Sequence, residues 1–189
     1  MNKVQELITD PIAPKYRYIY VPLPHGNAMA GTYVSMGGGA AAMAEVGSSG
    51  VGGQRFEVST DDVAGILFLP DDADVEHDID VAVLWSSDQT TTDSYTWDVN
   101  YGEFTINTTA VAVPATALDT TIAADTSVAT ANALQQTAWG TITASTLSGT
   151  FSDGYLHLFE VDPSAVGGTP SSDVVVVYGV VFRYQPRKI

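Results

Sequence analysis

The chain has 189 residues, no cysteine and a formal net charge of −15 at pH 7. This length fits one domain with an additional arm or loop. Without cysteine, stability has to come from packing or oligomerisation instead of disulfides. No run of about 18 apolar residues occurs, so we expect no membrane partner. The strong negative charge also makes nucleic acid an unfavourable partner, because phosphates would be repelled.

The basic residues lie only towards the two ends of the sequence. There is no Lys or Arg from Phe56 to Phe182, and most of the acidic residues fall in that stretch. The body is therefore a polyanion, whereas the ends can be attracted to an acidic partner. We expect partner contacts at five residues near the ends: Lys3, Lys15, Arg17, Arg187 and Lys188.

Residues 1–54 differ in composition from the rest of the chain. Four prolines between Pro11 and Pro24 disfavour helix and central strand. A short strand-like run covers Tyr16 to Val21, and a Gly/Ala-rich stretch from Gly37 to Gly53 is typical of a flexible loop. Two interpretations remain open: an extended arm that becomes ordered on a partner, or an edge strand followed by a loop of the same domain.

Residues 55–189 show short apolar runs separated by turn signals, which is typical of an all-β domain. The clearest alternation places Tyr95, Trp97, Val99 and Tyr101 on one face of a strand. The region 108–133 is expected to be mostly loop. The predicted strands are Arg55–Ser59, Ile66–Leu69, Asp80–Ser86, Tyr95–Tyr101, Glu103–Asn107, Gln136–Ala144, Tyr155–Val161 and a central strand buried on both faces, Val174–Tyr184.

This number of strands without a convincing helix predicts a two-sheet antiparallel β-sandwich. A jelly roll with an extended N-terminal arm is the expected architecture. An immunoglobulin-like sandwich is the alternative. The predicted organisation is an arm and Gly/Ala-rich loop over residues 1–54 and a sandwich domain over residues 55–189.

Two segments of the predicted sandwich resemble a known family. The segment VAVLWSSDQTTTDSYTWDVNYGEF (81–104) has a strand ending in Trp, a polar turn and a W-x-V-x-Y strand. The segment GYLHLFEVDPSAVGGTPSSDVVVVYGVVFRYQPRKI (154–189) is similar to a terminal hairpin with a V-Y-G-V-x-F-x-Y strand. Both resemble jelly-roll structural proteins of tailed-bacteriophage virions, over roughly residues 55–186.

The resemblance implies a structural protein of a capsid or tail that forms homotrimers or other clusters and carries out no catalysis. We therefore expect a capsid decoration (cement) protein that binds and stabilises the phage head, with the major capsid protein or other virion proteins as partners. Such a protein would be made in the host cytoplasm without a signal peptide, since Met1 to Asp10 lacks an apolar core. The alternatives are a tail, neck or fibre component, or a carbohydrate-binding module.

A cluster of acidic residues between Asp71 and Asp80 is a candidate for a calcium site. Calcium requires six to eight converging oxygen ligands. His77 stands where a calcium loop of the EF-hand type needs glycine. A solvated turn is therefore the preferred interpretation, with Asp72, Asp74 and Asp78 as the metal candidates, and no cofactor is expected.

The sequence contains no recognisable catalytic motif, and we expect no catalytic residue. Of the three histidines, His25, His77 and His157, the last lies on an alternating strand, where an interface or half-buried position is expected. Three tryptophans and two tyrosines could stack on sugars, but aromatic residues at alternating strand positions usually form the core. These five aromatic residues are Trp85, Trp97, Trp139, Tyr95 and Tyr101. Trp85 and Trp97 are therefore assigned to the core.

Overall fold

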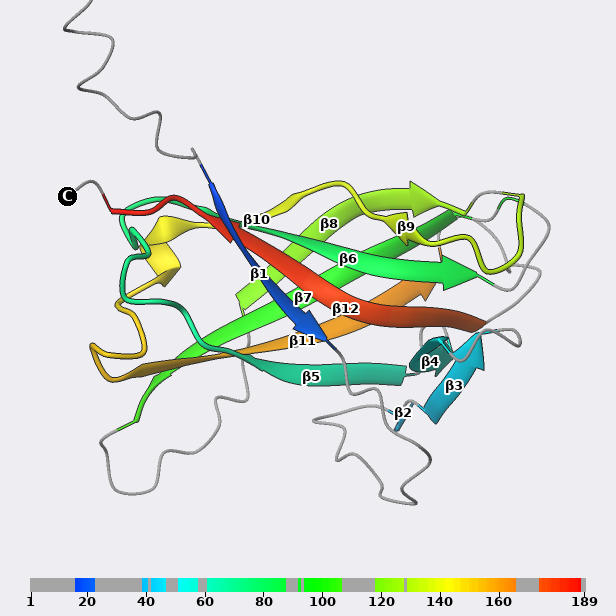
Figure 1. The fold of residues 1–189 in the computed structure, drawn as a ribbon, viewed down its shortest axis with the longest axis horizontal. Helices are drawn as coiled ribbons and strands as arrows, with labels where there is room; N and C mark the ends of the chain where they lie inside the picture. Colours follow the sequence, from blue (N-terminus) through cyan, green and yellow to red (C-terminus); the bar gives the residue numbers. More distant parts are fainter. Residues whose placement is uncertain are drawn as a thin grey trace, which may run out of the picture.

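The protein is an all-β sandwich in which two sheets pack against each other (Figure 1). The computed structural model describes residues 16–22, 39–40, 42–46, 51–57, 61–87, 92, 94–106, 118–127, 129–165 and 174–187. This confirms the predicted fold class, a two-sheet antiparallel sandwich. The finer assignment to a jelly roll stays a prediction, as does the domain boundary between residues 54 and 55.

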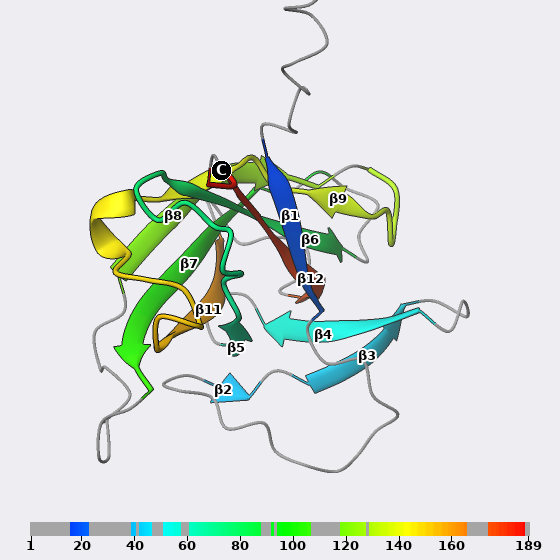
Figure 2. The same cartoon turned by 60° about the vertical axis from the view of Figure 1, so that its left-hand side comes forward.

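The first sheet has seven strands within the described residues. Its order is β10 (Gly140–Ile142), β6 (Ile79–Ser87), β12 (Val174–Tyr184), β4 (Val51–Glu57) and β3 (Ala42–Val46), with β1 (Arg17–Pro22) beside β12 and β9 (Gln135–Gln136) beside β6. All of these pairs are antiparallel. Figure 2 shows the hairpin formed by β3 and β4 from a second direction. We call this the seven-stranded sheet.

The second sheet has five strands within the described residues. Its order is β2 (Gly39–Ala40), β5 (Asp61–Leu67), β11 (Tyr155–Ala165), β7 (Ser94–Thr105) and β8 (Leu118–Thr126). Only the short pair β2–β5 is parallel. The long pairing of β11 with β7 runs from Tyr155 opposite Thr105 to Ala165 opposite Tyr95. We call this the five-stranded sheet.

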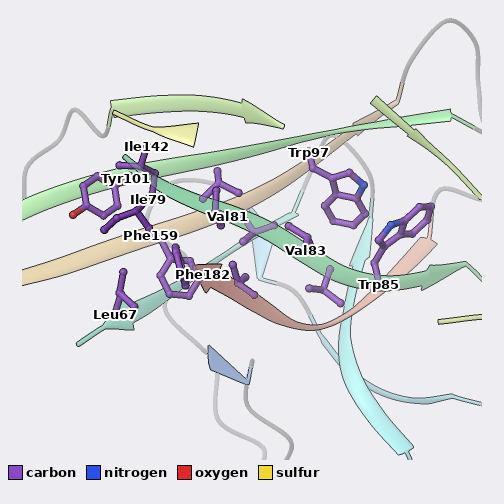
Figure 3. Close-up of a cluster of buried hydrophobic side chains, with 14 of the residues drawn as sticks. Leu67, Ile79, Val81, Val83, Trp85, Trp97, Tyr101, Ile142, Phe159 and Phe182 are labelled. Carbon is purple, nitrogen blue, oxygen red and sulfur yellow. The ribbon is translucent and has the colours of Figure 1, made fainter. Parts of the chain in front are cut away.

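The core lies between the two sheets, and alternating side chains supply it (Figure 3). On β7 the predicted inward face is confirmed, because all four of its residues are fully buried. On β6 the alternate residues Val81, Val83 and Trp85 are likewise fully buried, and Ile79 extends the row. The inward residues of these two strands are Tyr95, Trp97, Val99, Tyr101, Ile79, Val81, Val83 and Trp85.

The central position of β12 is confirmed, but its predicted burial on both faces is not, because Tyr178, Val181 and Arg183 are only partly buried. A β-bulge also changes which of its residues face inward. Val175 and Val177 are buried before the bulge, and Val180 and Phe182 are buried after it. The register against β6 shifts between Val177 and Gly179, so one extra residue of β12 is accommodated there. That extra residue moves the inward face from odd to even positions, which simple alternation cannot predict.

Several other strands differ from the predictions. The region 108–133 contains β8, which alternation does not reveal because its Ala- and Thr-rich sequence has weak amphipathic contrast. Strand β7 continues through Gly102, and β11 continues past Val161 through Pro163. The predicted strand Gln136–Ala144 is instead divided into β9, β10 and a short 3₁₀ helix, Ala144–Thr146.

Part of the predicted arm lies in the sandwich. Strand β1 matches the strand-like run noted in the sequence and pairs with β12 from Arg17 opposite Tyr184 to Pro22 opposite Gly179. Ile19 and Val21 pack against the core. Strands β2, β3 and β4 occupy much of the predicted Gly/Ala-rich loop. Residues 1–15 lie outside the described residues.

No helix among the described residues is long and apolar enough to cross a membrane.

Two core tryptophans offer a matched test of how the sheets are joined. The indole Nε1 of Trp85 on β6 donates a 3.0 Å hydrogen bond to Asp125 Oδ2 on β8, which connects the two sheets. The indole Nε1 of Trp97 is buried and has no hydrogen-bond partner among the described residues. The two rings pack against each other with centroids 5.2 Å apart.

We expect Trp85→Phe to lower the free energy of unfolding more than Trp97→Phe. Both changes leave a similar cavity, but only the first removes a hydrogen bond to a carboxylate, which is worth about 1.5–3 kcal/mol. Urea denaturation of both variants, with unchanged m values, measures the difference. Equal losses, or a larger loss for Trp97→Phe, would contradict this account.

Candidate functional site

The acidic loop between β5 and β6 is fastened to the two ends of the described chain. Its turn is closed by a 2.9 Å hydrogen bond from Ala73 N to Pro70 O. The C-terminal segment runs alongside it, where Arg187 N donates to Asp72 O at 2.7 Å and Asp74 N donates to Gln185 O at 2.9 Å. The acidic loop is therefore part of the sandwich.

The three metal candidates, Asp72, Asp74 and Asp78, each interact with different neighbours. Asp72 accepts from Arg17 and, at 3.0 Å, from the Tyr184 hydroxyl. Asp74 accepts from Glu76 N and lies 3.1 Å from the imidazole Nδ1 of His77. Asp78 Oδ1 accepts a 2.8 Å hydrogen bond from Ala144 N. In the part of the chain that the structure describes, no three His, Cys, Asp or Glu side chains converge as a metal site would need.

A shallow hollow of about 480 Å³ lies beside this loop. It is lined by Asp74, Val75, Glu76, His77, Gln185, Pro186 and Arg187. His77 is exposed there, with Asp74 as its ionic neighbour. The hollow brings together one imidazole and a set of carboxylates at an open surface.

The expected partner-contact residues that the structure describes are paired within the chain. Arg17 forms an ion pair with Asp72, and Arg187 Nη2 lies 3.8 Å from Asp153 Oδ2. Both guanidinium groups are about half exposed, so they remain accessible to a partner. The other candidates, Lys3, Lys15 and Lys188, lie outside the described residues. Contact between any of these residues and a partner stays a prediction.

Asp153 also orders the turn that precedes β11. Its Oδ2 accepts hydrogen bonds from the backbone N–H and the hydroxyl of Thr150, at 2.9 and 2.8 Å. These two bonds, together with the nearby Arg187, lower the pKa of Asp153. Gly154 completes the turn in the left-handed region with φ 90°, a conformation that favours glycine. Residues 151–154 form this turn.

His157 is fully buried, in contrast to the expected interface or half-buried position. Its Nε2 donates a 3.0 Å hydrogen bond to Gly149 O, and its Nδ1 accepts from the Tyr101 hydroxyl. Glu103 Oε2 lies 3.7 Å from Nδ1 and accepts a 2.8 Å hydrogen bond from Ser148 N. The cluster therefore holds the 148–149 segment against β7 and β11.

Burial determines the protonation of this cluster. It lowers the pKa of His157, because removal from water penalises the imidazolium form, and Glu103 and the Gly149 carbonyl offset this only in part. Burial and the neighbouring Glu103 carboxylate raise the pKa of Tyr101. A neutral imidazole and a neutral phenol are thus the stable pair inside the sandwich.

The aromatic residues divide into core and surface groups. Trp85 and Trp97 are fully buried, as predicted. Trp139 instead lies in part at the outer face of the seven-stranded sheet, near Tyr18 on β1. Tyr18 is 63% and Tyr20 49% exposed. Neither residue was among the sites predicted from the sequence. The signal for them was present in the alternation of Tyr16, Tyr18 and Tyr20 along a strand-like run.

Strand β5, the residues just after it and the turn before β11 expose a separate apolar surface. Ile66 is 45%, Phe68 56% and Phe151 47% exposed. The rings of Phe68 and Phe151 meet edge to face with centroids 5.2 Å apart. We call these three residues the apolar patch. Large apolar side chains that cluster at a surface usually mark an interaction site.

The buried imidazole predicts a specific pH dependence of stability. Above pH 6.5 both the folded protein and the unfolded chain hold the neutral form, so the contribution of His157 is complete. As the pH falls below about 6.5, the unfolded chain takes up the proton first, and the free energy of unfolding decreases. Chemical denaturation between about pH 7.5 and 5.5 measures this slope.

The matched variants are His157→Gln and His77→Gln. We expect His157→Gln to be less stable at pH 7.5 but to lose less stability on acidification, because the shifted group is gone. His77→Gln, which changes an exposed histidine, should keep the slope of the unaltered protein. An unchanged slope in His157→Gln would show that this cluster does not cause the pH dependence.

Comparison of the chain with protein-family models, with curated proteins and with solved structures found no match.

Proposed function

We propose that this chain is a structural virion protein, specifically a capsid decoration protein that binds the phage head surface and stabilises it. The observation that carries the proposal is the apolar patch, Ile66, Phe68 and Phe151, on the outside of a well-packed sandwich. The resemblance of residues 81–104 and 154–189 to phage jelly-roll proteins supports the same function. A protein of this kind acts through contact between surfaces.

The position of the patch supports contact with another protein. Ile66 lies on β5, whose Val63–Leu67 segment pairs with β11 on one side. On its other side, among the described residues, β2 pairs only with Asp61 and Asp62. An open strand edge with apolar side chains promotes association with another chain. Burying this surface would stabilise a complex by about 25 cal/mol for each Å² of apolar area removed from water.

The charge distribution favours an apolar contact over a purely electrostatic one. The chain carries a net charge of −15, so two copies repel each other across most surfaces. The three residues of the apolar patch carry no charge, and contact there avoids much of this repulsion. A closed homotrimer, in which each copy contributes the same patch, is the assembly that we propose.

A tail, neck or fibre position is the second form of the same proposal. It would use the same contact surface but place few copies on each particle, whereas decoration of the head requires many. Quantitative mass spectrometry of purified virions, with the major capsid protein as the internal reference, separates these two positions. Absence of the chain from virions would overturn both.

Replacing Ile66 and Phe68 together by Thr should weaken self-association. Both side chains are about half exposed, and Thr preserves strand propensity, so we expect little change in the free energy of unfolding. Sedimentation equilibrium over a range of protein concentrations measures the association, and binding to isolated phage heads measures attachment. We expect the double variant to dissociate to monomers and to bind heads more weakly.

Leu134→Ser is the control, because Leu134 is exposed on the loop before β9, outside the patch. It should leave both measurements unchanged. If the unaltered protein is monomeric at all concentrations and does not bind heads, the proposed function is wrong. If the double variant assembles and binds normally, the apolar patch is not the contact surface.

A further inference from the structure

We propose that the outer face of the seven-stranded sheet is a binding site for a neutral polysaccharide. The site consists of the rings of Tyr18, Tyr20 and Trp139, arranged beside the Arg183–Asp80 ion pair. We call these five residues the aromatic platform. The proposal concerns the sheet opposite to the apolar patch and does not depend on the function proposed above.

The strand register places the polar members of the platform in one row. Tyr18 of β1 lies opposite Arg183 of β12, and Arg183 lies opposite Asp80 of β6. Asp80 in turn lies opposite Thr141 of β10. Directly opposed residues in a sheet project to the same face. Four strands that are distant in sequence therefore contribute to one surface.

Hydrogen bonds and ring stacking fix this row. Arg183 Nε donates to Asp80 Oδ2 at 2.7 Å, and the Thr141 hydroxyl donates to Asp80 Oδ1 at 3.2 Å. The guanidinium carbon of Arg183 lies 4.2 Å from the centroid of the Trp139 ring and 4.7 Å from that of Tyr16. Two cation–π contacts hold the guanidinium group in place.

Tyr20 is held flat against the sheet while it remains half exposed. Its hydroxyl donates a 3.1 Å hydrogen bond to Tyr178 O, at the bulge of β12. A Cβ atom added to Gly179 would come within 2.5 Å of the Tyr20 ring. The glycine therefore allows the ring to lie directly on the backbone of β12, with its other side available to a ligand. Fixed rings lose little conformational entropy when a ligand binds.

This combination of groups matches the chemistry of a carbohydrate. Sugar rings present C–H groups that pack on aromatic faces, and their hydroxyls can both donate and accept hydrogen bonds. The platform offers exposed tyrosine faces beside a carboxylate, a guanidinium group and a hydroxyl. Tyr18 and Tyr20 lie two residues apart on one strand, about 6.6 Å along it. Such an open, extended surface suits the interior of a polymer chain.

Charge restricts the class of polysaccharide. The chain has a net charge of −15, and Asp80 balances the charge of Arg183 within the platform. An anionic polymer would be repelled by the molecule and would find no unbalanced cation in the platform. A neutral polysaccharide avoids this repulsion.

Tyrosine, tryptophan and arginine also recur in protein–protein contacts, so a protein ligand is the competing interpretation. The chemistry of the surface favours the sugar. The platform presents flat rings and polar groups, whereas the apolar patch on the other sheet presents Ile and Phe side chains. The two faces of the sandwich therefore suit different kinds of ligand.

The experiment is affinity electrophoresis of the full chain in gels containing a β-glucan, a mannan, a galactan or dextran, with alginate as an anionic control. Isothermal titration calorimetry on the retarding polymer then gives the association constant. We expect at least one neutral polymer, but not alginate, to retard the protein. Tyr18→Ala and Trp139→Ala should each reduce the association constant at least tenfold.

Two further variants separate ring stacking from general damage. Tyr18→Phe keeps the ring and should retain binding, whereas Ile106→Ala removes an exposed apolar side chain just after β7, outside both the platform and the apolar patch, and should have no effect. Circular dichroism and urea denaturation establish that each variant is folded. The proposal is overturned if no neutral polymer retards the protein, if alginate retards it equally, or if Ile106→Ala weakens binding as much as Tyr18→Ala does.

Loss of head binding or self-association in Tyr18→Ala, without any sugar binding by the unaltered protein, would identify a protein-contact surface and also overturn the proposal. Failure of the sugar experiment leaves the assembly experiment on Ile66 and Phe68 unaffected. The two proposals therefore fail independently.

Discussion

The packing of two central strand pairs, β6–β12 and β7–β11, against each other is the interaction on which the rest of the molecule depends. Each sheet buries one face only because the other covers it, and the apolar contacts are contributed by residues far apart in sequence. Trp85 joins the layers in two ways, since its ring packs on Tyr95 and Trp97 while its indole N–H reaches Asp125. Without disulfides, these contacts have to maintain the alignment of the sheets.

Ion pairs within the chain offset part of the large negative charge locally. The three arginines whose side chains the structure describes each lie against an aspartate of this chain: Arg17 against Asp72, Arg183 against Asp80 and Arg187 against Asp153. The pairs Arg17–Asp72 and Arg187–Asp153, whose guanidinium groups are about half exposed, contribute little stability individually. The Arg17–Asp72 pair also has a geometric consequence, since it joins the start of β1 to the acidic loop.

The two outer faces of the sandwich differ in chemistry because different residue types occupy the outward positions of their strands. On β5 the outward side chains include Ile66, which gives a surface suited to another protein. On β1 they are tyrosines, and the neighbouring strands add Arg183 and Asp80 in register. One hydrophobic core can therefore support two separate proposed contact surfaces, one on each side of the sandwich.

The sequence by itself determined the fold class and much of the core, because period-two alternation directly reports which side of a strand is buried. Trp85, Trp97 and the limits of β12 could all be predicted in this way. Strand β8 was missed because its Ala- and Thr-rich sequence has little contrast between faces. The shift of inward residues on β12 was missed because it depends on a bulge set by pairing with β6.

Only the tertiary structure determined which surface side chains lie next to one another. The candidate carboxylates Asp72, Asp74 and Asp78 looked similar in sequence, yet strand pairing and the path of the chain ends gave each a different partner. His157 was expected at an interface or in a half-buried position, but the 148–149 segment covers it. The aromatic platform joins β1 to strands at least 57 residues later, so only the cross-strand register brings Tyr18, Asp80 and Arg183 together. Local sequence patterns specify which face of a strand is buried, whereas long-range pairing specifies which side chains meet on the exposed face.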